Sequence, residues 1–224
     1  MKRSEINRAI DVAKETLKEY RFALPPFAAW TPEMWSKTGH EVDRIKTCGL
    51  GWDVSDYGAG DFKTFGTVFF TLRNGVANNP GMGTPYAEKI MILEPGQRLP
   101  LHFHWCKTED IINRGGGIMV MELYNSLSDD TLDRESTVQI YCDGMLRSVA
   151  PGEFFEIMPG ESITLAPRIF HRFWASKNGG MLICGEVSSV NDDSSDNCFA
   201  EPVARYTSIE EDEPSRYVLC NEYK

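Results

Sequence analysis

Two of the four histidines in the chain, His102 and His104, stand two residues apart in the stretch LPLHFHW. Alternate residues of a β-strand point to the same face of a sheet, so both imidazoles would face one side. On an inward face two unsatisfied imidazoles are costly to bury, and one metal ion would satisfy both. The pair alone also fits two histidines that hydrogen-bond to backbone on a barrel wall. A metal site is therefore a hypothesis that needs further ligands.

Two other residues complete a candidate ligand set. Glu109 follows His104 by five residues, where the chain can cross a turn and return a carboxylate to the same interior. His171 lies far along the chain on another expected strand, between aromatic residues. Three imidazoles and one carboxylate suit Mn²⁺, Fe²⁺, Co²⁺, Ni²⁺ or Zn²⁺, and the lack of a thiolate does not favour a closed structural zinc site. We expect a divalent metal, Mn²⁺ before the others, held by His102, His104, Glu109 and His171.

The elements that must position these residues are expected to be strands. From Tyr86 to Val187, short stretches rich in β-branched and aromatic residues recur about every ten residues, with turn signals such as Pro159-Gly160 between them. Such spacing is typical of an antiparallel sandwich or barrel. We expect an all-β fold in one domain over residues 1–224, with a barrel core at about residues 86–190.

The two ends of the chain differ from this core. Apolar residues fall at helical spacing behind Ser4, a plausible N-cap, so an amphipathic helix is expected over residues 4–20. After Val190 the chain is polar and acidic without periodicity, and we expect an irregular C-terminal segment. A solvated surface tail and a functional segment are both open for it.

Composition excludes some classes of protein. The formal net charge of −10 works against binding a polyanion, because nucleic acids are bound largely through Lys and Arg. No run approaches the ~20 apolar residues of a membrane span, and the N-terminus lacks a signal-type apolar stretch. The six cysteines contain no C-x-x-C pair, which favours reduced thiols in a cytoplasm.

A glycine frame around the histidine pair adds a resemblance. Gly96, His102, His104, Glu109 and Gly116 match the first cupin motif position by position. The second motif is matched more loosely by Gly160, Pro167 and His171, since His171 follows the proline by four residues instead of five. The resemblance implies a cupin double-stranded β-helix barrel with the metal in its mouth.

Longer stretches resemble one family within the cupins. HFHWCKTEDIINRGGG, GLGWDVSDYGAGDF and GEVSSVNDD are similar to the corresponding parts of bacterial D-lyxose isomerases, and the similarity extends over nearly the whole chain. It implies a metal-dependent aldose–ketose isomerase that interconverts D-lyxose and D-xylulose, and D-mannose and D-fructose, through a cis-enediol. It also implies a homodimer whose ligand is a neutral sugar.

That chemistry needs a base for the carbon-bound proton and a proton-bearing group for the oxygens, besides the cation. Lys107 is tethered between two predicted ligands, and its pKa is expected to fall toward neutrality near a cation. The resemblance places a carboxylate of the C-terminal segment across from this lysine, which selects Glu201. We expect Lys107 and Glu201 to form the acid–base pair, in either order, and Asp193 and Glu186 to hold sugar hydroxyls.

Three alternatives stay open. The same ligand set would serve an iron dioxygenase, and a cupin that only binds sugar would need no acid–base pair. A phosphosugar isomerase would need positive charge at the far end of its substrate. The candidates for such charge are Arg168, Arg172 and Arg205, which are otherwise structural arginines.

Overall fold

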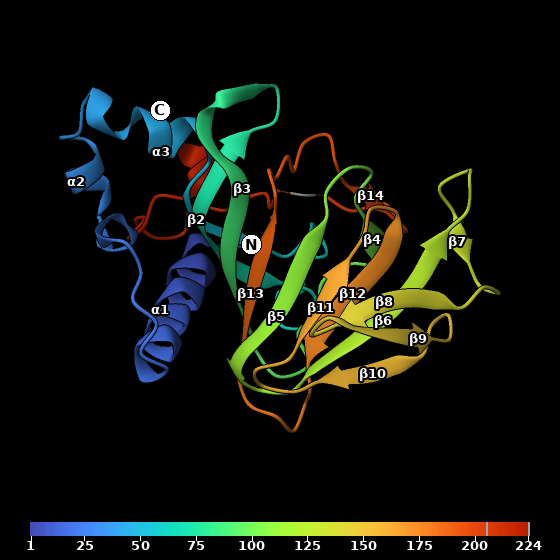
Figure 1. The fold of residues 1–224 in the computed structure, drawn as a ribbon. Coiled ribbons are helices and arrows are strands. Elements are labelled where there is room, and N and C mark those ends of the chain that lie inside the picture. The colour runs from blue at the N-terminus through green and yellow to red at the C-terminus, as the bar shows by residue number, and fades with distance from the viewer. Residues whose placement is uncertain (205, 224) are drawn as a thin grey trace.

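The structure of the protein is a computed structural model that describes residues 1–204 and 206–223 (Figure 1). Its helices are α1 (Arg3–Glu19), α2 (Pro32–Trp35) and α3 (Asp43–Thr47), with the 3₁₀ turns η1 (Pro26–Ala29), η2 (His40–Val42) and η3 (Cys220–Glu222). Among the described residues, no helix is both long enough and apolar enough to cross a lipid bilayer. All three α-helices precede the first strand.

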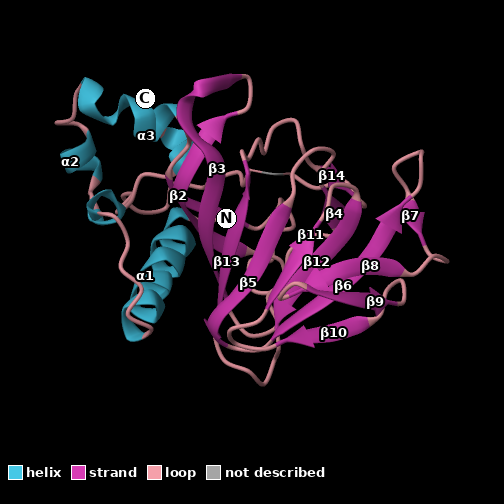
Figure 2. Cartoon of the chain, in the orientation of Figure 1, coloured by secondary structure: helices cyan, strands magenta, loops and turns pink. Residues whose placement is uncertain are grey.

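Strands make up most of the remaining body. They are β1 (Gly51–Ser55), β2 (Thr67–Val76), β3 (Asn79–Leu93), β4 (His102–Phe103), β5 (Glu109–Gly116), β6 (Met119–Ser126), β7 (Leu132–Asp133), β8 (Val138–Cys142), β9 (Met145–Val149), β10 (Phe154–Ile157), β11 (Ser162–Leu165), β12 (Ile169–Ala175), β13 (Leu182–Ser189) and β14 (Cys198–Phe199). One sheet has the order β1-β2-β3-β13-β5-β11-β8-β9, and the other β10-β6-β12-β4-β14, with β7 beside β6. Figure 2 shows these strands curling into a barrel-like body with the helices to one side.

The core lies between the two sheets because strand side chains alternate between faces. Met91 of β3 and Ile111 of β5 belong to the same buried cluster as Met121 of β6 and Phe173 of β12. The expected all-β cupin barrel with an N-terminal helix is confirmed. The larger sheet begins earlier than the expected core, since β1 and β2 precede residue 86.

Helix α1 covers the outer face of the larger sheet at β1–β3. Its apolar stripe, which includes Ile10 and Leu17, packs with Phe70 of β2 and Ile90 of β3 in a second buried cluster. The helix begins at Arg3, so the expected capping role of Ser4 is wrong. The Ser4 hydroxyl donates to the Asp212 carboxylate instead, at 2.7 Å.

The C-terminal segment is irregular, as expected, but it is no free tail. Its short strand β14 pairs with β4, so Phe199 lies opposite His102. Further on, the segment runs along α1, where the buried Arg3 guanidinium donates to the carboxylates of Glu211 and Glu222. Residues from the far end of the chain therefore border the predicted metal ligands.

Candidate metal centre and active site

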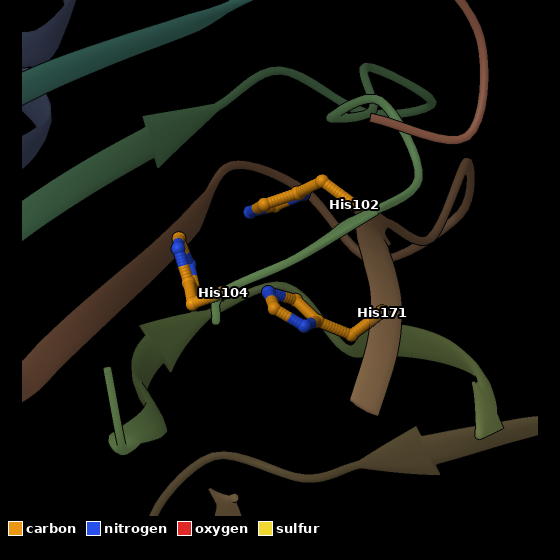
Figure 3. Close-up of side chains that lie close together, drawn as sticks. All are labelled: His102, His104 and His171. Carbon is orange, nitrogen blue, oxygen red and sulfur yellow. The ribbon is translucent and has the colours of Figure 1, made fainter. Parts of the chain in front are cut away.

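Three histidines gather at the inner face of the smaller sheet (Figure 3). His102 lies on β4 and pairs directly with His171 on β12, while His104 follows two residues after His102. One ring nitrogen from each histidine can be chosen so that all three lie within 4.8 Å of one another. Figure 3 shows the three imidazoles turned toward a common space. The sequence prediction that these three residues meet is confirmed.

The hydrogen bonds of the three rings fix which nitrogen is free. In each ring Nδ1 faces a backbone carbonyl oxygen, which only accepts, so Nδ1 carries the proton and donates. The acceptors are the carbonyls of Pro100 for His102 (2.9 Å), Asp196 for His104 (2.7 Å) and Ile169 for His171 (3.0 Å). Every Nε2 atom is therefore left with a lone pair. For His102, burial together with the neighbouring His171 and His104 holds the ring pKa well below its usual range, which keeps it neutral.

Glu109, the first residue of β5, faces the same space. Its Oε1 atom lies 2.9 Å from Nε2 of His171 and 3.5 Å from Nε2 of His104. Both Glu109 Oε1 and His104 Nε2 are buried, and neither has a hydrogen-bond partner among residues 1–204 and 206–223. Lone pairs that face one another in a buried site need a cation between them, since leaving them unpaired is costly. Three imidazoles and one carboxylate thus fit a divalent metal, with Glu109 as the predicted fourth ligand.

Lys107 connects these residues to a second carboxylate. Its ammonium group is buried and lies 2.8 Å from Oε2 of Glu109, 2.9 Å from Oε1 of Glu186 on β13 and 3.3 Å from Oδ1 of Asn191. Burial acts to lower the pKa of Lys107, but the charges of Glu109 and Glu186 outweigh it and raise the pKa. The two carboxylates thus stabilise the charged form of Lys107, and the expected fall of its pKa beside a cation stays a prediction.

Glu186 is ionised because positively charged lysines lie beside it. Its burial acts to raise its pKa, but the charges of Lys107 and Lys89 outweigh that effect and lower it. Lys89 Nζ lies 3.6 Å from Glu186 Oε1 and 3.8 Å from Asp193 Oδ1. Glu186 and Asp193, which sequence analysis selected for sugar hydroxyls, thus join Lys107 in one network of ion pairs.

A small cavity opens onto these groups. It has a volume of about 40 Å³ and is lined by Lys107, Glu109, Glu186 and Asp193 together with the three histidines. A second cavity, of about 320 Å³, adjoins it and shares Phe69, Lys89 and Asp193 as lining residues. One water molecule needs ~10–15 Å³ on this scale. The first cavity therefore has room for a few groups the size of a water molecule, and the second has room for a longer chain of such groups.

Four residues singled out in the sequence lie away from this cavity or outside the described residues. The Glu201 side chain is exposed and does not line the cavity, so its catalytic role stays a prediction. Arg168 pairs with Asp130, and Arg172 pairs with Glu122 on the outer side of the smaller sheet. Arg205 lies outside the described residues.

Two residues that help to organise the site were not predicted from the sequence. Asp196 accepts the backbone N–H groups of Cys106 (2.8 Å) and Lys107 (2.9 Å), so it holds the loop between the predicted ligands. The signal for it in the sequence was too weak, because it lies in an acidic segment without periodicity. Lys89 could have been found, since it is the one charged residue on the inward face of β3 beside Met91 and Leu93.

The fold and the histidine cluster define a class, that of cupin barrels with a site suited to a divalent metal. The chain belongs to the D-lyxose isomerase family, whose sequence pattern it matches over residues 1–223. Relatives named D-lyxose/D-mannose isomerase from Escherichia coli O157:H7 and Serratia proteamaculans are 45% and 42% identical over 100% of this chain, and 99% and 98% of theirs. The L-ribose isomerase of Acinetobacter sp. DL28, solved with L-ribose, shares the fold with a TM-score of 0.61 and 15% identity, over 94% of this chain and 98% of that one.

We expect His171→Ala to weaken the binding of Mn²⁺ at least about 100-fold. Removing a residue that only hydrogen-bonds to a metal ligand typically weakens metal binding by about 10–100-fold, and removing the ligand itself should weaken it more. The matched control is His40→Ala, since the His40 side chain is fully exposed at 101% of its reference area and lies outside the cluster. Calorimetric titration of metal-free protein measures both affinities. Equal affinities in the two variants would contradict the site.

Proposed function

We propose that this protein is an aldose–ketose isomerase that interconverts D-lyxose and D-xylulose, and D-mannose and D-fructose. The observation that carries the proposal is a buried Lys107–Glu186 ion pair beside three convergent imidazoles in one cavity. The family, and the names of two relatives aligned over the whole chain, support the same reaction. They favour an isomerase over the dioxygenase and over a cupin that only binds sugar.

The reaction moves one proton between C1 and C2 of the sugar and another between O1 and O2. A divalent ion held by His102, His104, His171 and Glu109 would supply Lewis acidity toward the sugar oxygens. The protein residues must bind the sugar, carry the two protons and keep water away. The lining residues Phe69, Met91 and Phe173 give the cavity an apolar wall, which strengthens the electrostatic interactions inside it.

Lys107 is placed to serve the oxygens. Its ammonium group donates to Glu109, Glu186 and, over the longest of the three distances, Asn191, and a sugar oxygen that gains negative charge would replace Asn191 as acceptor. A charged lysine can donate a proton there and recover it when the second oxygen loses its own. The raised pKa of Lys107 makes the protonated form its resting state.

Glu186 fits the carbon-bound proton better than Glu201 does. It is buried, lines the cavity and is ionised, with its pKa lowered by Lys107 and Lys89 against the effect of burial. An ionised carboxylate can take a proton from one carbon and return it to the next. Glu201 would need the C-terminal segment to move before it reached the cavity. We therefore assign the carbon side to Glu186, and keep Glu201 as the alternative from the sequence.

The rest of the sugar extends toward the second cavity. Lys89 and Asp193 line both cavities, and Thr71, Asn74 and Asn191 add polar groups to the larger one. Hydroxyls and amides suit a neutral polyol, and among the described residues of this lining there is no arginine of the kind that a phosphosugar would need. Asp193 is the residue that we expect to bind a sugar hydroxyl directly.

Further parts of the proposal rest on the family resemblance. We propose Mn²⁺ as the metal, a homodimer as the assembly and the cytoplasm as the location. The free thiols of six cysteines agree with a reducing compartment.

The decisive assay is carried out without oxygen. We expect protein loaded with Mn²⁺ to form D-fructose from D-mannose and D-xylulose from D-lyxose under nitrogen, because proton transfer consumes no oxidant. Chromatographic detection of the ketoses measures the rate. An absolute need for oxygen and Fe²⁺ would identify a dioxygenase, and no turnover under either condition would leave a binding protein.

Glu186→Gln is expected to lower kcat by about 10²–10⁴-fold, the usual contribution of a general base, while Glu201→Gln stays close to the parent protein. Both substitutions remove one charge with little change of shape. Initial rates with D-mannose measure kcat, and Mn²⁺ affinity measured alongside verifies that the metal site is intact. The reverse order of effects would return the role to Glu201.

Asp193→Ala is expected to raise KM about tenfold with a smaller change in kcat, because it removes a hydrogen bond made equally in the ground and transition states. Saturation curves for D-lyxose and D-mannose separate the two parameters. A fall in kcat at constant KM would instead show that Asp193 takes part in the proton transfer.

A further inference from the structure

A separate hollow lies on the outer face of the smaller sheet, away from the two adjoining cavities of the proposed sugar site. Its volume is about 520 Å³, and its lining includes Lys63, Arg98, Phe154, Arg172, Trp174 and Lys177. Strand β12 separates the two sites: His171 and Phe173 point inward and line the sugar cavity, whereas Arg172 and Trp174 point outward and line the hollow. The strands β10 and β12 that border it are marked in Figure 2.

The hollow is positively charged in a strongly acidic protein. Its described lining residues include two lysines and two arginines but no carboxylate, although the chain has a net charge of −10. The charge of Arg172 is balanced by Glu122. Lys63, Arg98 and Lys177 form no ion pair with any residue that the structure describes. Three uncompensated cations around one concave surface attract an anion.

Arg98 is the best-positioned of these cations. Its backbone is bridged to Phe65 on one side and to Trp174 on the other, and its guanidinium carbon lies 4.2 Å from the centre of the Phe65 ring. The Nε atom is buried and has no hydrogen-bond partner in the described part of the chain. A guanidinium held in this way presents a planar set of donors that matches phosphate oxygens.

An aromatic pair borders the cations. Phe154 is 61% exposed, unusually open for its size, and packs edge-on against Trp174 with 5.1 Å between ring centres. Such a ring offers a flat apolar face beside the charged donors. The hollow thus combines donors for a phosphate with a surface for a planar group.

We propose that this hollow binds a phosphate monoester, a site separate from sugar isomerisation. Arg98 and the two lysines bind the phosphate oxygens, and Phe154 packs against the organic group. Inorganic phosphate would use the cations alone, whereas a nucleoside monophosphate would also use the aromatic face. The proposal does not depend on the isomerase activity, since none of these residues lines the sugar cavity.

The test is calorimetric titration of the Mn²⁺-loaded protein with AMP, inorganic phosphate and adenosine. We expect AMP and phosphate to bind and adenosine not to bind, with AMP the tighter of the two. The double variant Lys63→Gln/Lys177→Gln should lose about tenfold or more in AMP affinity, because both charges act on the phosphate. Arg98→Gln should have a similar effect.

The matched control is Lys18→Gln/Lys37→Gln, which removes two lysines that are 80% and 70% exposed elsewhere on the surface. It should leave AMP affinity unchanged, and saturating D-mannose should not displace AMP. No binding of AMP or phosphate at millimolar concentration would overturn the proposal. So would an equal loss in the control variant, or displacement by D-mannose, which would place the phosphate at the sugar cavity instead.

Discussion

The site depends on the lone pairs of three histidine Nε2 atoms and of one Glu109 oxygen, which face one another inside an apolar barrel. The three imidazoles cannot turn their protons inward, because each Nδ1–H is engaged with a backbone carbonyl. The Glu109 carboxylate faces the same space, and one of its oxygens has no hydrogen-bond partner in the part of the chain that the structure describes. Burying such a set without a cation costs free energy that the rest of the barrel must offset. The site is therefore organised to bind a cation.

The charges around this group are arranged for the same purpose. Glu109, Glu186 and Asp193 face Lys89 and Lys107, so the cavity formally holds one more negative than positive charge. With a divalent ion the balance becomes one positive charge, which suits sugar oxygens that become negative during reaction. Lys107 is central to this balance because it contacts both Glu109, which faces the histidines, and Glu186, to which we assign the carbon-bound proton.

The parts of the site that depend on local geometry could be predicted from the sequence. His102, His104 and Glu109 lie within eight residues, and the two-residue period of a strand is enough to set both histidines on one face. The amphipathic helix and the run of short strands were predicted for the same reason. His171 was selected as a histidine on another expected strand and by a looser match to the second cupin motif, and it pairs with His102 across sixty-nine positions of sequence.

Prediction was weaker where position depends on distant contacts. Asp196 and Glu201 lie in a segment without periodicity, whose path is set by pairing of β14 with β4 and by contacts with α1. No spacing rule could show that Asp196 would hold the Lys107 loop, or that the Glu201 side chain would be exposed. Lys89 is different, because its alternation with Met91 and Leu93 was visible in the sequence and indicates a buried inward lysine.

Strand β12 shows how strictly the pairing must be kept. Its seven residues pair in continuous register with β6, from Ile169 opposite Asn125 to Ala175 opposite Met119. A shift by one residue would turn every side chain to the opposite face. Arg172 would then enter the apolar core while His171 left its partners. The same alternation that buries an imidazole at the sugar cavity sets a guanidinium on the outer hollow, so both surfaces depend on one register.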